Sequence, residues 1–152
     1  MPEIRNDYNV SLEYMSTNIQ FPINYGLLKV GLPLIVVKLF DNDICLLLDT
    51  GSNRNIIDYR IHNHFKDKLL ESKRSDSLLT LNGQSEGVEV SIPFTFEGVD
   101  YNECFVCTNE TDSFDTIRKE SGIQIHGILG NNFFLKEGWV IDFDKQLVYT
   151  NH

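Results

Sequence analysis

The sequence has no hydrophobic run long enough to cross a bilayer. Its longest apolar stretch, from Leu32 to Phe40, is interrupted by Pro33 and Lys38, whereas a membrane-spanning helix needs about 20 consecutive apolar residues. The first five residues also lack a basic segment followed by an apolar core, so nothing in this chain directs secretion. We therefore expect a cytoplasmic protein without a membrane segment; a leader removed from a longer chain would instead imply export.

Cysteine and basic residues are also scarce. The three cysteines are an odd number, which argues against a secreted disulfide framework and suits a reducing compartment. Cys104 and Cys107 form a single CxxC without a second Cys or His pair at ligand spacing, so we expect no metal and interpret the cysteines as small buried residues. The net charge of −9 disfavours nucleic acid and anionic membranes as partners.

Neither an internal repeat nor a linker rich in Pro, Gly and Ser divides the 152 residues. With 41% apolar residues, the chain is expected to form one compact domain, which we place at residues 29–152. Residues 1–28 are an N-terminal segment of uncertain role. It could add a strand, cover a dimer edge or act as an inhibitory pro-segment. The alternation of apolar Ile19, Phe21, Ile23 and Tyr25 with other residues favours an added strand.

Short apolar segments separated by turns predict a mainly β chain. Strands are expected at residues 34–40, 44–48, 88–96, 101–107, 139–143 and 147–149, with turns at 41–43, 97–100 and 145–146. The strand at 88–96 has the clearest period-two alternation, and Pro93 within it indicates an edge or a bulge. Many short strands with few helices imply a closed or sandwiched β architecture.

Two short helices are expected between these strands. Ile61, Phe65 and Leu69 recur at i, i+4 and i+8, the pattern of an amphipathic helix over residues 58–72. Residues 111–121 predict a second helix, with Gly122 as its C-terminal cap.

Asp49 is the main candidate for chemistry. It follows the apolar run Ile44–Leu48, so a buried strand would deliver its carboxylate to a turn in which Gly51 permits close approach of the backbone. Thr50 and Ser52 add hydroxyls that can tie the loop and hydrogen-bond the carboxylate. Asp-Thr-Gly is also a common turn sequence after a strand, so the tripeptide alone does not decide between a turn and a site.

Peptide hydrolysis by water gives such a carboxylate a specific task. One carboxylate must take a proton from water, and one carboxylic acid must polarise the carbonyl. Two facing carboxylates cannot both ionise cheaply, so they share a proton and titrate as one coupled unit. Aspartic proteases are the established example of this arrangement.

The order of segments resembles the retropepsin-like family of aspartic proteases, which includes retroviral and bacterial members. Two motifs carry the resemblance: Leu46–Ser52, an apolar run into Asp-Thr-Gly, and Ile128-Leu129-Gly130, similar to the segment that passes beneath the catalytic loop. The implied fold is a closed β-barrel of the pepsin/retropepsin type with one or two short helices and a flap hairpin. The expected helices at 58–72 and 111–121 depart from the compact retroviral members.

The resemblance also implies roles for single residues. Asp49 is implied to be catalytic, Thr50 to brace two active-site loops against each other, and Gly51 to allow the tight approach of the loop. Ser52, Ile128, Leu129 and Gly130 are implied to be structural near the site. A glycine lets a strand cross close to another loop, and ordinary core packing explains the two apolar residues equally well. No cofactor is implied.

A flap hairpin is expected between residues 78–81 and 88–90. Its tip would be residues 82–87, with Asn82, Gly83 and Gln84 as the candidates for contact with an extended peptide. A surface hairpin without a role remains the alternative.

The chain contains no second Asp-Thr-Gly. The nearest imitations, Asp115-Thr116-Ile117 and Glu120-Ser121-Gly122, do not follow an apolar run. One chain therefore holds half of a dyad, and a two-fold homodimer would bring two Asp49 side chains together, leaving monomers inactive. We expect an aspartic endopeptidase acting on polypeptide substrates; the alternative is a catalytically inactive dimeric peptide-binding module on the same fold.

Other polar residues have simpler interpretations. We expect His126 to be a structural hydrogen-bond donor, and His62 and His64 to be solvated. The i, i+2 spacing of Asp142 and Asp144 places them on the solvent face of a strand, opposite Trp139, Ile141 and Phe143, rather than at a metal.

Overall fold

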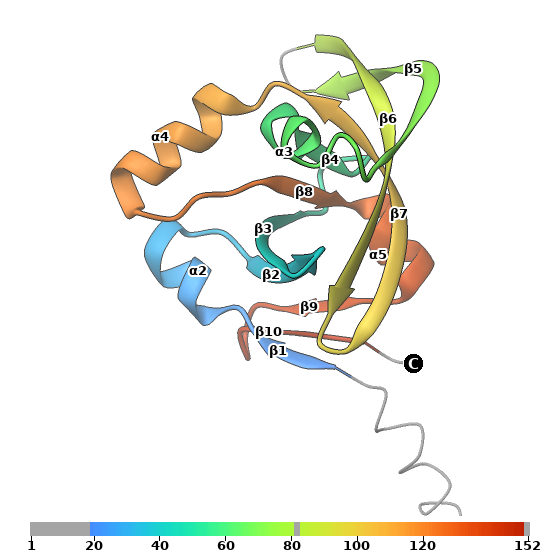
Figure 1. Ribbon diagram of the computed structural model, residues 1–152. Coiled ribbons are helices and arrows are strands. Elements are labelled where there is room, and N and C mark those ends of the chain that lie inside the picture. The colour runs from blue at the N-terminus through green and yellow to red at the C-terminus, as the bar shows by residue number, and fades with distance from the viewer. Residues whose placement is uncertain (1–18, 81–82, 151–152) are drawn as a thin grey trace, which may run out of the picture.

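A closed β-barrel forms the body of the molecule, which is known from a computed structural model describing residues 19–80 and 83–150. In order around the barrel, its strands are β2 (Leu34–Leu39), β3 (Asn42–Asp49), β8 (Gly127–Gly130), β4 (Ile56–Asp58), β7 (Val99–Thr108) and β6 (Gly83–Phe96). A pairing of Lys38 in β2 with Thr95 in β6 closes the ring. β5 (Leu70–Thr80) extends beyond β6 as an edge strand (Figure 1). The expected mainly β, closed-barrel architecture is confirmed.

A small second sheet lies beside the barrel. It consists of β1 (Gln20–Pro22), β10 (Leu147–Tyr149) and β9 (Val140–Asp142), all antiparallel, with β10 in the middle. The chain therefore joins its N-terminal and C-terminal parts in one sheet, seen below the barrel in Figure 1.

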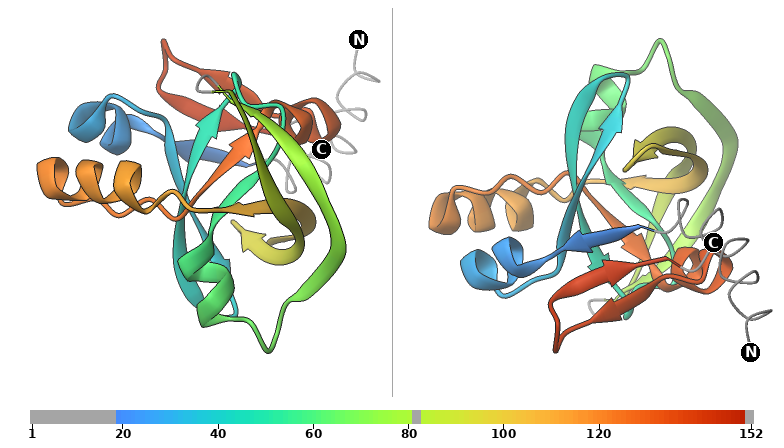
Figure 2. Two further views of the ribbon diagram at one scale, coloured as in Figure 1. Left: turned by 90° about the horizontal axis from the view of Figure 1, so that it is seen from above. Right: turned by 90° about the horizontal axis from the view of Figure 1, so that it is seen from below.

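Four helices occur among the described residues. They are α2 (Asn24–Val30), α3 (Tyr59–His64), α4 (Thr111–Ser121) and α5 (Asn131–Glu137). α2 and α4 lie side by side on one flank of the barrel (Figures 1 and 2). None of these helices is both long enough and apolar enough to cross a membrane.

The apolar side chains form two clusters that meet at β8. The larger cluster fills the barrel and contains Leu129, whereas the smaller one lies toward α2 and α4 and contains Ile128. Because side chains alternate along a strand, neighbouring residues of β8 serve opposite clusters. All four residues of β8 are buried.

Several elements end where the sequence predicts. α4 spans residues 111–121 and is closed by Gly122 at φ 80°, as expected. In β6, Val90, Ile92, Phe94 and Phe96 are buried while Pro93 is exposed. Pro93 lies between the residues that pair with β5 and the residue that pairs with β2, so it occupies a gap in the ladder on that side of β6.

The helix expected over residues 58–72 is much shorter. α3 ends at His64, yet Phe65 and Leu69 are still buried, because a turn in which the Leu69 N–H donates to the Phe65 carbonyl (3.1 Å) keeps the i, i+4 spacing. From Leu70 onward the chain pairs with β6. Sheet pairing has overridden the helical pattern.

Three smaller expectations also need correction. The alternation at residues 19–25 predicts one strand, but β1 stops at Pro22 and Tyr25 lies in α2. Phe40 and Asp41, both with positive φ, make the turn into β3, so Asn42 already belongs to that strand. Phe143 is 60% exposed, because β9 ends at Asp142 and a turn follows.

Candidate active site

Asp49 is the last residue of β3. The apolar residues Ile44, Leu46 and Leu48 point from this strand into the core, and the half-buried Asp49 follows them at the carboxyl end. β8 runs parallel to β3 with Gly130 opposite Asp49. The buried strand therefore delivers a carboxylate to the surface beside the end of β8.

Short hydrogen bonds fix the loop that follows. The Gly51 N–H donates to Oδ1 of Asp49 (2.9 Å), and the Ser52 N–H donates to the Asp49 carbonyl (3.1 Å). The Ser52 hydroxyl donates to the carbonyl of Arg54 (2.6 Å), so it ties the loop rather than binding the carboxylate. Arg54 in turn pairs with Glu89 of β6 at 2.6 Å. The Asp49 carboxylate is thus oriented by a backbone donor.

Gly130 lies directly against this loop. A Cβ at Gly130 would come within 2.5 Å of the Arg54 carbonyl oxygen and 2.9 Å of the Ser52 carbonyl oxygen. The next residue, Asn131, donates its N–H to the Ser52 carbonyl (2.8 Å). The absence of a side chain at residue 130 lets β8 and the Asp49 loop touch through their backbones.

Asn55 also belongs to this arrangement, although no sequence motif marks it. It follows the loop directly, is 1% exposed, and accepts a hydrogen bond from the Gly130 N–H through Oδ1 (2.9 Å). Its side-chain amide donates to the carbonyl of Cys104 in β7 (3.2 Å). One sequence feature could have indicated its role. Asn55 directly precedes the apolar pair Ile56-Ile57, so its side-chain amide is expected to be buried and to need hydrogen-bond partners.

Thr50 is exposed at the tip of the loop. It lines a cavity of about 270 Å³ together with side chains of α5 and of the segment that leads through β9, namely Asn131, Phe134, Leu135, Trp139, Ile141 and Phe143. Leu135 and Phe143 at its rim are 77% and 60% exposed. An exposed apolar surface therefore adjoins the loop that carries Asp49.

The expected flap corresponds to the hairpin of β5 and β6. Gly83 and Gln84 pair with Thr80 and Leu79, so β6 begins at Gly83 and the connection between the strands is shorter than the expected tip at residues 82–87. Asn82 lies outside the described residues.

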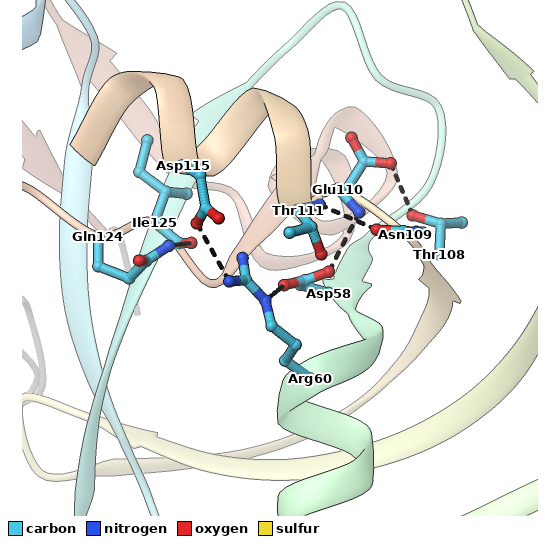
Figure 3. A network of polar contacts seen from close by, with 9 residues as sticks. All are labelled: Asp58, Arg60, Thr108, Asn109, Glu110, Thr111, Asp115, Gln124 and Ile125. Carbon is cyan, nitrogen blue, oxygen red and sulfur yellow. Dashed lines mark hydrogen bonds and ion pairs between the residues drawn. The ribbon is translucent and has the colours of Figure 1, made fainter. Parts of the chain in front are cut away.

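A cluster of charged side chains lies at the end of β4 (Figure 3). Asp58 is 2% exposed and accepts hydrogen bonds from the Glu110 N–H (3.1 Å) and from Nε of Arg60 (2.6 Å). Arg60 also pairs with Asp115 of α4 (3.1 Å), and its hydrogen bond to Asp58 raises the pKa of the guanidinium. Both Asp58 oxygens are occupied, so the cluster ties α3 and α4 to the barrel.

His126 acts through its ring as an acceptor, not as the expected donor. The Cys45 N–H donates to His126 Nδ1 (2.9 Å), and the His126 N–H donates back to the Cys45 carbonyl (2.9 Å). Burial lowers the pKa of His126, and Arg60 lowers it further. By accepting at Nδ1, the His126 ring joins the segment before β8 to β3.

The remaining sequence candidates are dispersed. His64 is exposed, but His62 is half-buried, contrary to the expectation of a solvated ring. Asp142 accepts the Lys145 N–H in the turn after β9 (2.9 Å). Within the described ranges, no group of three or more His, Cys, Asp or Glu residues could hold a metal ion.

The cysteines differ in their surroundings. Cys45 and Cys107 are half-buried, whereas Cys104 is exposed, which corrects the prediction that all are buried. Burial raises the pKa of the Cys45 thiol to about 11, so it is protonated near neutral pH. Cys104 and Cys107 do not form a disulfide.

Comparison with solved structures identifies the fold. No protein-family model matches the sequence, and no curated protein matches it. The structure is similar to a retropepsin-like aspartic protease from Rickettsia conorii, with a TM-score of 0.58 and 18% identity over 89% of this chain and 90% of that one. It is also similar to the retroviral protease-like domain of Ddi1 from Leishmania major, with a TM-score of 0.53 and 10% identity over 82% of this chain and 91% of that one. The chain has the retropepsin-like fold.

Proposed function

We propose that the protein is an aspartic endopeptidase whose active site forms between two copies of the chain. In this proposal, one Asp49 carboxylate takes a proton from a water molecule, and that water attacks the peptide carbonyl. The other Asp49, protonated, donates to the carbonyl oxygen, and a proton then passes to the leaving amine. The arrangement needs no metal or organic cofactor.

The position and the fixed orientation of the Asp49 carboxylate support this proposal most directly. Its carboxylate sits at the end of a buried strand, and one of its oxygens accepts a hydrogen bond from Gly51. A carboxylate held by backbone geometry is suited to catalysis, because it loses no orientation when substrate binds. The Ser52 backbone bonds to Asp49 and Asn131 hold the loop, which lies directly against Gly130.

We propose a dimer because the mechanism needs two Asp-Thr-Gly carboxylates and each chain has one. The chain has a single Asp-Thr-Gly, and Asp58, the next acidic residue along the chain, is committed to Arg60 and Glu110. A second copy is the simplest source of the missing group. The exposed Thr50, with the apolar Leu135 and Phe143 beside it, suits a surface that a second copy covers.

Substrate would bind as an extended peptide. β5 is the last strand of its sheet, so its outer edge offers backbone groups to another strand. In this proposal, the hairpin of β5 and β6 is the flap, with Asn82, Gly83 and Gln84 at or beside its tip. Thr50 of each copy would brace the two loops.

The test compares wild type with Asp49→Asn on a mixed peptide library between pH 4 and 7. Asp144→Asn is the matched control, because Asp144 is exposed and lies in the turn after β9. We expect cleavage by wild type and by the control, and none by Asp49→Asn, because an amide cannot accept the proton of water. A statine-type peptide analogue should inhibit the wild type.

The outcome also separates the two candidate functions. If wild type and Asp49→Asn both bind peptides and neither cleaves any, the protease proposal fails and the inactive peptide-binding module takes its place. If Asp49→Asn cleaves as well as wild type, another group performs the chemistry.

A further inference from the structure

We infer that Asn55 is a positioning residue that sets the placement of the Asp49 carboxylate by clamping the end of β8 onto the catalytic loop. This inference rests on the proposed function for its catalytic consequence. The structural part of it, that Asn55 holds the loop, is independent of whether the protein cleaves peptides.

Two side-chain hydrogen bonds and one backbone hydrogen bond join Asn55 to β8 and β7. Its Oδ1 accepts from the Gly130 N–H at 2.9 Å, and its Nδ2 donates to the Cys104 carbonyl at 3.2 Å. Its own carbonyl accepts from the Val106 N–H at 2.8 Å. The amide can satisfy a backbone N–H on one side and a backbone C=O on the other in only one orientation, so its direction is fixed.

These connections lie immediately behind the catalytic loop. Gly130 pairs with Asp49 across β8 and β3, and its backbone touches the carbonyls of Ser52 and Arg54. The N–H of the next residue, Asn131, donates to the Ser52 carbonyl and also holds the loop. The Gly130 N–H would lack this acceptor without Asn55, and a buried unpaired N–H is costly, so the end of β8 would move.

A small movement of the end of β8 would reduce the reaction rate more than it would reduce the stability of the fold. A displacement of about 1 Å in a reacting group can reduce a rate by about 10²-fold. In a homodimer both copies carry the same displacement, so the two Asp49 carboxylates are misplaced together. Asn55 touches neither substrate nor water in this scheme and acts through Gly130.

Asn55→Leu and Asn55→Asp separate positioning from simple stability. Leucine has a similar size but makes neither hydrogen bond. Aspartate at acid pH is a carboxylic acid whose carbonyl accepts from Gly130 and whose hydroxyl donates to Cys104; once ionised, it faces the Cys104 carbonyl without a proton to give. Asn63→Leu is the control, because Asn63 is exposed on α3.

The measurements are kcat and KM at pH 4 to 7, hydrogen exchange at the Gly51 amide, and near-UV circular dichroism to confirm folding. We expect Asn55→Leu to lower kcat by about 10- to 100-fold with little change in KM, and to speed exchange at Gly51. Asn55→Asp should approach wild type at pH 4 and resemble Asn55→Leu at pH 7. The control should match wild type throughout.

Two results would overturn the inference. One is a folded Asn55→Leu with the kcat and the Gly51 exchange rate of wild type. The other is an Asn55→Asp whose activity relative to wild type does not depend on pH. If wild type itself cleaves nothing, the proposed function fails, but exchange at Gly51 still decides whether Asn55 holds the loop. If Asn55→Leu does not fold, the pH dependence of Asn55→Asp provides the same decision.

Discussion

Adding one methyl group at Gly130 should strongly destabilise the protein, because the backbone of the loop after Asp49 lies close to Gly130. In Gly130→Ala, the Cβ would lie 2.5 Å from the Arg54 carbonyl oxygen, 2.8 Å from its carbonyl carbon and 2.9 Å from the Ser52 carbonyl oxygen, where ordinary contact begins at 3.4 Å. All three neighbours are backbone atoms. No side-chain rotation can relieve the overlap, so either β8 or the loop that follows Asp49 must move.

We expect this change to lower the free energy of unfolding by about 3 kcal/mol, the upper end of the usual range for overpacking. For a domain of this size, that corresponds to a fall in Tm of roughly 10 °C. Urea unfolding followed by fluorescence measures it directly, because the protein has a single tryptophan, Trp139, and it is buried.

Gly127→Ala supplies the matched control within the same strand. Its Cβ would meet the Ile56 carbonyl oxygen at 2.6 Å, but its other close neighbours are the ends of the Ile57 and Leu46 side chains. Both variants should lose stability. Only Gly130→Ala should also reduce cleavage per folded molecule, by about 10-fold or more, because only Gly130 lies opposite Asp49. A Gly130→Ala protein as stable as wild type, or an equal loss of cleavage in both variants, would refute the reasoning.

Three further predictions concern pH, the acidic cluster and the dimer. His126→Asn should reduce the pH dependence of the free energy of unfolding. Because the pKa of His126 is lowered in the folded protein, its contribution to stability is complete above the ordinary value of 6.5 and is lost as the pH falls below it. The asparagine oxygen can accept the Cys45 N–H without titrating, and urea unfolding at pH 5 and 7 measures the difference. Asp58→Asn should cost roughly 2 kcal/mol in the same assay, because it weakens the bonds to Arg60 and Glu110, and an unchanged midpoint would contradict the account. Phe143→Glu should shift sedimentation toward monomer while leaving the fold intact; a dimer as stable as that of wild type would place the interface elsewhere.

The sequence predicts an element well when the residues of that element alone determine its structure. The alternation in β6 and the glycine cap of α4 need only the residues of the element itself. α4 forms as expected, and β6 ends at Phe96 as expected but begins earlier than predicted, at Gly83. The end of α3 is different, because Leu70 leaves the helical pattern to pair with Ser91, which is distant in sequence. Periodicity cannot reveal a competing strand that forms only in the folded chain.

In the candidate site, too, residues in contiguous motifs can be predicted from the sequence, whereas residues whose partners are distant in the sequence cannot. The apolar run into Asp-Thr-Gly is contiguous and marks Asp49 without a structure, and the Ile-Leu-Gly motif marks Gly130. Asn55 carries no such motif, because its role comes from two backbone groups, at Gly130 and Cys104, that only the barrel brings together. The acceptor role of His126 is hidden for the same reason: its donor, Cys45, is 81 residues away.

The most direct test of the shared active site is subunit mixing. Wild type and Asp49→Asn, unfolded together in equal amounts and refolded, should form dimers at random, so about one quarter of the dimers would carry two intact carboxylates. We predict that activity falls to about one quarter of that of the same total amount of wild type, whereas proteins refolded separately and then assayed at once keep about one half. If the co-refolded mixture also keeps one half, each chain works alone and the shared site is wrong.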